Sequence, residues 1–116
     1  MYASFEDLDV WRRACQLAVR VYQILEGCRD FGLKDQMQRA AVSIASNIAE
    51  GAERGPKEFA HFLRIARGSA AELRTQTYIA AKIGIIKPEE MNEIVEETKQ
   101  LAKMLYALAK SLKTEN

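Results

Sequence analysis

The segment from Gln38 to Gln76 most constrains the fold, because it reads as two long helices with a single sharp corner at Gly55-Pro56. Proline is favoured at the first position of a helix, where its missing N–H would have no partner anyway. On the N-terminal side of the corner, apolar residues recur at helical steps of four, three and four: Met37, Ala41, Ile44 and Ile48. The pattern predicts helices from about Lys34 to Arg54 and from Pro56 to about Ile83.

Two more helices flank this pair. The first is predicted from Asp7 to Gly27, and Ser4 with Asp7 three residues later resembles a capping box at its start. The last opens at Lys87-Pro88 and continues an apolar face as far as Leu112. Four long helices joined by short turns predict an all-α, antiparallel up-down-up-down four-helix bundle. At 116 residues, the whole chain (1–116) is expected to form one domain.

Gly68-Ser69 interrupts the composition of the third helix. A glycine inside a helix costs about 1 kcal/mol relative to alanine. We therefore expect a close helix crossing or a slight kink at this point.

The first helix carries two neighbouring apolar seams. One consists of Leu8, Trp11, Cys15, Ala18, Tyr22 and Leu25, and the other of Val10, Ala14, Leu17, Val21 and Ile24. Together they make a wider stripe than a helix needs to face one core. The surplus has two interpretations, namely deep burial within its own bundle or contact with a second subunit, and the sequence leaves both open.

The composition is that of an ordinary globular protein, with 48% hydrophobic and 28% charged residues. No stretch has the length of a membrane span, and the acidic N-terminus does not resemble a signal peptide. Cys15 and Cys28 lie too far apart on one helix to form a disulfide. Two free thiols favour a reducing compartment, so we expect a cytoplasmic protein that has no membrane partner.

Signatures of catalysis and of metal binding are sparse. The single histidine, His61, follows Glu58 in one Glu-x-x-His motif, whereas a di-iron bundle needs two such motifs and two further glutamates. There is no phosphate-binding loop, dinucleotide fingerprint or zinc spacing. The sequence therefore predicts no catalytic residue, no metal site and no cofactor.

Polar residues line one face of each central helix. Arg39, Ser43, Asn47, Glu50 and Arg54 share a face of one, and Ser69, Glu72 and Gln76 share a face of the other. Because residues equally distant from the corner face each other in a hairpin, we expect an Arg39–Glu72 ion pair, with Ser43 near Arg67. Buried polar groups need hydrogen-bond partners. The predicted network that fixes helix register comprises Arg39, Ser43, Asn47, Glu50, Ser69, Glu72 and Gln76, although a polar site at a subunit interface or central channel is the alternative.

The net charge of +1 does not by itself indicate nucleic acid, but the charges are unevenly distributed. Acidic residues cluster from Glu89 to Glu97, and lysines follow at positions 99, 103, 110 and 113. The candidate phosphate contacts are the densest basic run, Lys57, Arg64, Arg67 and Arg74, which Arg12, Arg13 and Arg20 could extend. Arginine suits phosphate because its planar fork donates two hydrogen bonds, but solvated surface charges are the alternative.

The sequence resembles the family of 23S rRNA intervening-sequence proteins, also called S23 ribosomal proteins, over nearly its whole length. The opening matches at Phe5, Leu8, Val10 and Trp11. The most specific matches lie in the centre: residues 39–44, residues 47–51, Arg54, Phe59, Phe62-Leu63, Ala66, Gly68-Ser69, Glu72 and Thr75-Gln76.

The resemblance implies a four-helix bundle that assembles as a ring-like homopentamer and has no enzymatic activity. It implies that some relatives are encoded inside intervening sequences of bacterial 23S rRNA genes. Distant relatives are accessory proteins of diversity-generating retroelements that bind nucleic acid and a reverse transcriptase through a basic surface.

Three functions are compatible with these observations. The first is a non-enzymatic, homo-oligomeric scaffold or accessory protein that binds RNA or DNA. The second is an interaction module whose partner is another protein. The third is a small-molecule or metal site within the bundle, which would involve His61.

Overall fold

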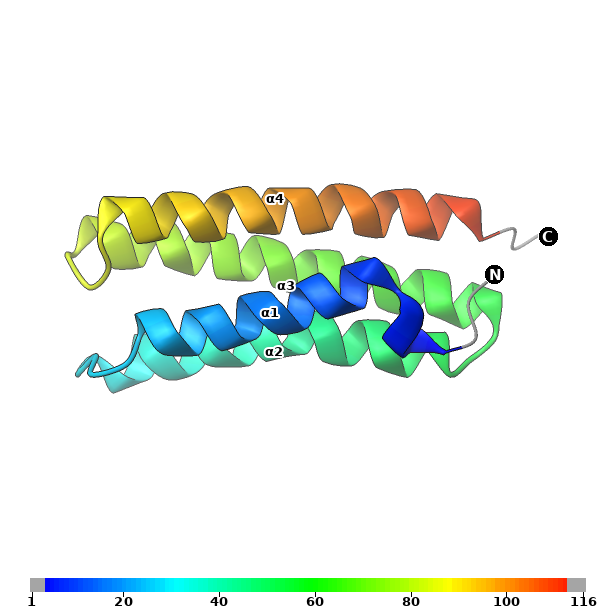
Figure 1. Cartoon of the computed structure of the whole chain (residues 1–116), viewed down its shortest axis with the longest axis horizontal. Helices are drawn as coiled ribbons and strands as arrows, with labels where there is room; N and C mark the ends of the chain where they lie inside the picture. The colour runs from blue at the N-terminus through cyan, green and yellow to red at the C-terminus, as the bar shows by residue number, and fades with distance from the viewer. Residues whose placement is uncertain (1–3, 113–116) are drawn as a thin grey trace.

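The computed structural model describes residues 4–112 and therefore leaves out the last predicted lysine, at position 113. A 3₁₀ turn, η1 (Phe5–Asp7), precedes four helices: α1 (Asp9–Ile24), α2 (Phe31–Ala52), α3 (Pro56–Lys82) and α4 (Pro88–Ser111). The helices lie side by side in a body of 47 × 21 × 19 Å, and their connections alternate between its two ends (Figure 1). The predicted antiparallel four-helix bundle is confirmed.

The core lies along the bundle axis, where all four helices contribute side chains. Each helix packs against its neighbours in the sequence, and α1 also packs against α4, which closes the bundle. The largest fully buried side chains include Val21, Leu25, Met37, Ile44, Ile48, Phe59, Leu63, Leu73, Ile94, Leu101 and Leu105. Burial of these aliphatic and aromatic groups is the main driving force for folding.

The first helix is shorter than predicted. The Ser4–Asp7 capping box is confirmed, but it caps η1, and the chain is extended at Leu8 before α1 begins at Asp9. The second helix begins at Phe31, earlier than predicted, because the Asp30 carboxylate accepts the backbone N–H of Leu33 at 3.1 Å and caps the new turn.

Glycine explains one close helix crossing, though not at the predicted position. A Cβ built on Gly51 of α2 would lie 2.6 Å from the Cβ of Phe62 on α3, so only glycine allows this approach. A Cβ built on Gly68 would meet no atom of residues 4–112 within 4 Å, so the expectation of a close crossing at Gly68 is wrong for this part of the chain. Gly68 lies on the exposed surface of a continuous α3.

None of the helices in residues 4–112 is long and apolar enough to cross a membrane. Cys15 and Cys28 are both free thiols.

Candidate nucleic-acid interface

One half of the α3/α4 surface is rich in basic side chains. Because the helices are antiparallel, the N-terminal half of α3 lies beside the C-terminal half of α4. Residues 59–71 and 98–112 contain no aspartate or glutamate, and Arg64, Arg67, Lys99, Lys103 and Lys110 all come from these two segments. We call these five residues, together with Tyr106, the α3/α4 basic face.

Tyr106 links the two helices within this face. The guanidinium carbon of Arg67 lies 5.0 Å from the centroid of the Tyr106 ring, and the Lys110 Nζ lies 5.7 Å from it. Both distances are within the range of cation–π attraction. Tyr106 nevertheless remains 50% exposed, which leaves an aromatic surface among the cations.

Arg74 lies farther along α3 and faces α4. Its Nε donates to the Oγ1 of Thr98 at 3.1 Å, and that hydroxyl donates to the backbone carbonyl of Val95 at 2.8 Å. Nε is thereby engaged within the chain, and the side chain is only partly exposed. Arg74 therefore lies at the border of the basic face, and its hydrogen bond to Thr98 holds the side chain in place.

Lys57 and Arg64 are exposed on α3. Within residues 4–112, neither side chain forms an ion pair or a hydrogen bond. Their charges are therefore available to an external partner, although Lys57 lies almost two turns before Arg64 at the start of the helix. Of the four predicted contact residues, Arg64 and Arg67 lie in the basic face, and Lys57 and Arg74 lie at its two ends along α3.

Tyr106 and the α4 lysines were not among the contact residues predicted from the sequence. Lys99, Lys103, Tyr106 and Lys110 follow one another at steps of four, three and four, which places them on one outward face of α4. That spacing was available in the sequence. The sequence does not show that Arg67 contacts Tyr106, and this contact joins the outward face of α4 to α3.

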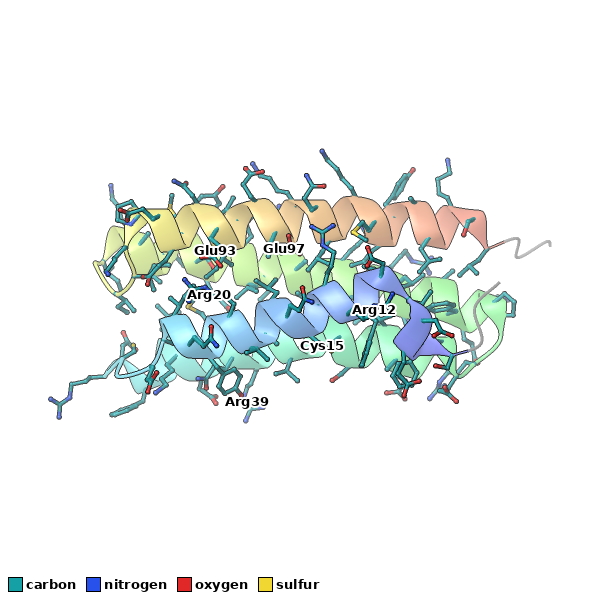
Figure 2. All side chains as sticks on the ribbon, viewed as in Figure 1. Arg12, Cys15, Arg20, Arg39, Glu93 and Glu97 are labelled. Carbon is teal, nitrogen blue, oxygen red and sulfur yellow. The ribbon has the colours of Figure 1, made fainter. Side chains whose placement is uncertain are left out.

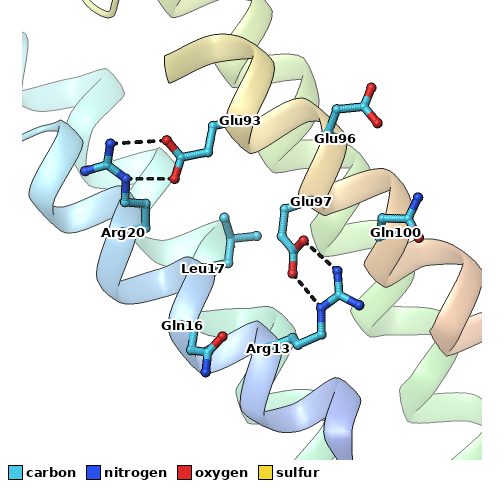
Figure 3. A pocket seen from close by; sticks show the side chains of 8 residues that line it. All are labelled: Arg13, Gln16, Leu17, Arg20, Glu93, Glu96, Glu97 and Gln100. Carbon is cyan, nitrogen blue, oxygen red and sulfur yellow. Dashed lines mark hydrogen bonds and ion pairs between the residues drawn. The ribbon is translucent and has the colours of Figure 1, made fainter. Parts of the chain in front are cut away.

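The α1 arginines do not extend the basic face. Arg13 Nε and Nη2 donate to the two carboxylate oxygens of Glu97 at 2.9 and 2.7 Å, and Arg20 is paired in the same way with Glu93 at 2.8 and 3.1 Å (Figure 3). The hydrogen bond to Glu97 raises the pKa of Arg13, and that to Glu93 raises the pKa of Arg20. Arg12 donates instead to the backbone carbonyl of Glu6.

These pairs bridge a polar cleft of about 570 Å³ between α1 and α4, which Gln16, Glu96 and Gln100 also line. Because each arginine there is matched by a carboxylate, the cleft presents no excess positive charge. Arg13 and Arg20 therefore do not extend the basic surface onto α1, as the sequence suggested they could.

Three members of the predicted polar network meet between α2 and α3. The Oγ atoms of Ser43 and Ser69 lie 2.9 Å apart, and the Asn47 Nδ2 donates to the Ser43 Oγ at 2.9 Å and to its backbone carbonyl at 2.8 Å. Ser69 is buried and the other two are half-buried. Ser43 thus contacts Ser69 and not Arg67, the predicted neighbour.

The other four members lie elsewhere. The predicted Arg39–Glu72 ion pair is wrong, because Arg39 pairs with Asp35 on its own helix at 2.9 Å, on the outer surface of α2 (Figure 2). Glu50 likewise pairs with Arg54 at 2.9 Å. Glu72 is exposed, and Gln76 is buried with its Oε1 lacking a partner within the described residues.

His61 is exposed and its ring contacts Phe62 edge-on at 5.8 Å between centroids. Within residues 4–112, no three His, Cys, Asp or Glu side chains are grouped so as to hold a metal ion.

Comparison with known proteins agrees with the resemblance that the sequence shows. A family model for the 23S rRNA-intervening sequence protein matches residues 6–107. The fold is similar to a crystal structure from Bacteroides thetaiotaomicron, described as a protein with unknown function from the S23 ribosomal protein family, with a TM-score of 0.81. The two chains are 24% identical, and the alignment covers 87% of this chain and 98% of that one. No curated protein matches the chain.

Proposed function

The chain belongs to the 23S rRNA-intervening sequence protein family, and we propose that it is a non-enzymatic, homo-oligomeric scaffold or accessory protein that binds RNA or DNA. The observation that carries this proposal is the α3/α4 basic face. Five cations lie on two adjacent helix segments, residues 59–71 and 98–112, without an acidic residue among them. Phosphate contacts of this kind dominate the affinity of proteins for nucleic acid. The proposed site of action is the cytoplasm.

Along α4, the basic residues are separated from the acidic ones. The acids of α4, from Glu89 to Glu97, all precede Lys99, Lys103 and Lys110 along the helix. Separation of this kind gives a locally positive potential even though the net charge is only +1. A polyanion would therefore be attracted to one end of the α3/α4 surface.

Self-assembly is supported by the surface of α1. Its seam of Val10, Ala14, Leu17 and Val21 is buried in the bundle, but Trp11 and Cys15 of the other seam are only half-buried. With Val19, Val42 and Ala45, these two residues line a groove of about 480 Å³ between α1 and α2, which we call the α1/α2 apolar groove.

Val19 is 58% exposed and Val42 is 42% exposed, so the groove offers apolar surface that a second subunit could bury. A ring of five, as the resemblance implies, would present five copies of the basic face. Several weak sites acting together bind far more tightly than one, provided that their geometry allows simultaneous contact.

The alternative is an interaction module that binds a protein and no nucleic acid. A second apolar groove, of about 630 Å³, lies where α3 turns into α4 and is lined by Tyr78, Ile79, Ile83, Pro88 and Met91, among others. Tyr78, Ile79 and Ile83 are each about half exposed there. Surface of this kind favours a protein partner.

A charge-reversal experiment distinguishes these functions. The variant Arg64→Glu/Lys103→Glu reverses two charges of the basic face, whereas Arg29→Glu/Lys34→Glu makes the same change in net charge at the opposite end of the bundle. The proposal predicts that labelled structured RNA and DNA bind the wild type and the control variant, and that only the first variant loses binding. Equal binding by both variants would refute the assignment of the face, and no binding by the wild type would favour the protein partner.

A further inference from the structure

The α3/α4 basic face contains an element that phosphate binding alone does not require. Cations without an aromatic group suffice to hold a sugar–phosphate backbone. Here Tyr106, a half-exposed residue, lies within cation–π distance of both Arg67 of α3 and Lys110 of α4, and Lys99 and Lys103 share its face of α4. Aromatic rings set within a basic groove are typical of proteins that bind single strands, because every base has a flat face that can stack.

From this arrangement we propose that the basic face binds single-stranded nucleic acid and that one base stacks on the Tyr106 ring. The inference rests on the proposed function and specifies the class of nucleic acid. Stacking does not distinguish ribose from deoxyribose, so single-stranded RNA and DNA are both ligands of this chemistry.

The cations near the ring do not prevent stacking. Arg67 and Lys110 approach Tyr106 at a partly exposed surface, where a cation–π contact is weaker than the stacking of a base on an aromatic ring. An incoming base can therefore displace either cation from the ring. The displaced guanidinium or ammonium group stays close enough to donate to an adjacent phosphate.

Small residues occupy the surface of α3 beside these cations. Gly68 follows Arg64 by one helical turn, and Ala71 follows Arg67 by one turn. Both positions are exposed, and the space above Gly68 is open for at least 4 Å. No contact within residues 4–112 requires this glycine, but a bare helix surface lets a sugar–phosphate backbone lie close to the arginines.

A regular duplex cannot use the Tyr106 ring. Its bases are stacked on one another and must be unpaired before they can meet a side chain face to face. The ring lies on the side of a helix and does not project from a loop or wedge that could open a duplex. Stacking on Tyr106 therefore selects a segment that is already single-stranded.

The test uses fluorescence anisotropy of the full-length protein with labelled 20-nucleotide unstructured RNA and DNA and a blunt DNA duplex of the same length. Tyr106→Ala should weaken binding to both single strands by about tenfold and leave duplex binding unchanged. Tyr106→Phe keeps the ring and should keep the affinity. Tyr22→Ala, which removes another half-exposed tyrosine from α1, is the matched control and should change neither.

Each outcome decides a different claim. Equal affinity of the wild type and Tyr106→Ala for single strands would overturn the inference. If Tyr106→Ala kept its affinity for single strands while Arg64→Glu/Lys103→Glu alone lost duplex binding, the proposed function would stand and the inference about Tyr106 would not. Binding of neither form by the wild type would overturn both. Thermal unfolding of each variant confirms that it folds, and Tyr106→Phe is an independent test should Tyr106→Ala not fold.

Discussion

The hydroxyl oxygens of Ser43 and Ser69 lie 2.9 Å apart and form the one side-chain hydrogen bond between α2 and α3 within the described residues. Asn47 donates to the same Ser43 oxygen, so the pair is part of a small network among side chains that are mostly apolar. A hydrogen bond between two side chains in such an interface can form in only one relative position of the two helices. Sliding one helix along the other would leave the buried Ser69 hydroxyl without a partner, which opposes a change of register.

Removing one partner of this contact should lower stability. Ser43→Ala leaves the buried Ser69 hydroxyl unpaired and should reduce the free energy of unfolding by about 1–2 kcal/mol. The double variant Ser43→Ala/Ser69→Ala should lose less than the sum of the two single variants, because neither unpaired hydroxyl remains. Urea denaturation of the four proteins measures this coupling. Strict additivity would mean that the two hydroxyls do not interact.

Two glycine substitutions should have opposite effects. Gly51→Ala places a Cβ 2.6 Å from the Cβ of Phe62, which is fixed close to the backbone, so α2 and α3 must separate. We expect a loss of about 1–3 kcal/mol. Gly68→Ala enters open space in the middle of a helix and should add up to about 1 kcal/mol.

Thermal or urea unfolding of the two glycine variants under identical conditions provides the comparison. Each serves as the control for the other, since both replace a helical glycine with alanine. A stabilising Gly51→Ala would contradict the close crossing in the structure.

Two arginine substitutions should show that an ion pair between two helices contributes more to the free energy of unfolding than an ion pair within one helix. Arg13 and Glu97 join α1 to α4 through two hydrogen bonds, with side chains 33% and 28% exposed. Arg13→Gln should therefore cost up to about 1 kcal/mol at low salt, and less as salt is added. Within the described residues, Arg39, 79% exposed, pairs only with Asp35 one turn away, so Arg39→Gln should stay within about 0.5 kcal/mol of the wild type.

The salt dependence of urea unfolding checks both arginine variants. If Arg39→Gln were the more destabilising of the two, Arg39 would have a partner other than Asp35.

Self-association through the α1/α2 apolar groove makes a separate prediction. Light scattering should give the wild type a mass about five times that of the 13.1 kDa chain, the number that the resemblance implies. Val19→Arg puts a charge into the groove and should shift the mass toward one chain without unfolding the bundle, because Val19 is exposed in the isolated subunit. Gln36→Arg, on the exposed surface of α2, is the control.

A wild-type mass of one chain would contradict assembly. An assembled Val19→Arg variant would contradict only the assignment of the groove.

Most of the fold follows from local signals in the sequence. Gly55-Pro56 and Lys87-Pro88 mark two helix starts correctly, because proline at a first helical position reflects backbone geometry alone. Which residues of α2 and α3 lie opposite each other depends on how their side chains pack. The pairing expected from equal distance to the corner is wrong here. Ser43 meets Ser69 and not Arg67, Arg67 instead contacts Tyr106 of α4, and Arg39 pairs with Asp35 and not with Glu72.

The candidate site was predictable only in part. Arg64 and Arg67 stood out because basic residues recur on α3, but the contribution of α4 needed the antiparallel contact that joins Arg67 to Tyr106. The α1 arginines failed as candidates for a related reason. Glu93 and Glu97, which neutralise Arg20 and Arg13, are more than seventy residues away in the sequence.

The most direct test of the central claim is the affinity of the wild-type protein for labelled single-stranded RNA across a salt series. Each phosphate contact on a single strand lowers log affinity by about 0.7 per tenfold increase in salt. If the five cations of the basic face contact phosphates, the slope should be about −3 or steeper, and it should flatten in Arg64→Glu/Lys103→Glu. No binding at low salt, or an affinity that does not change with salt, would contradict the account.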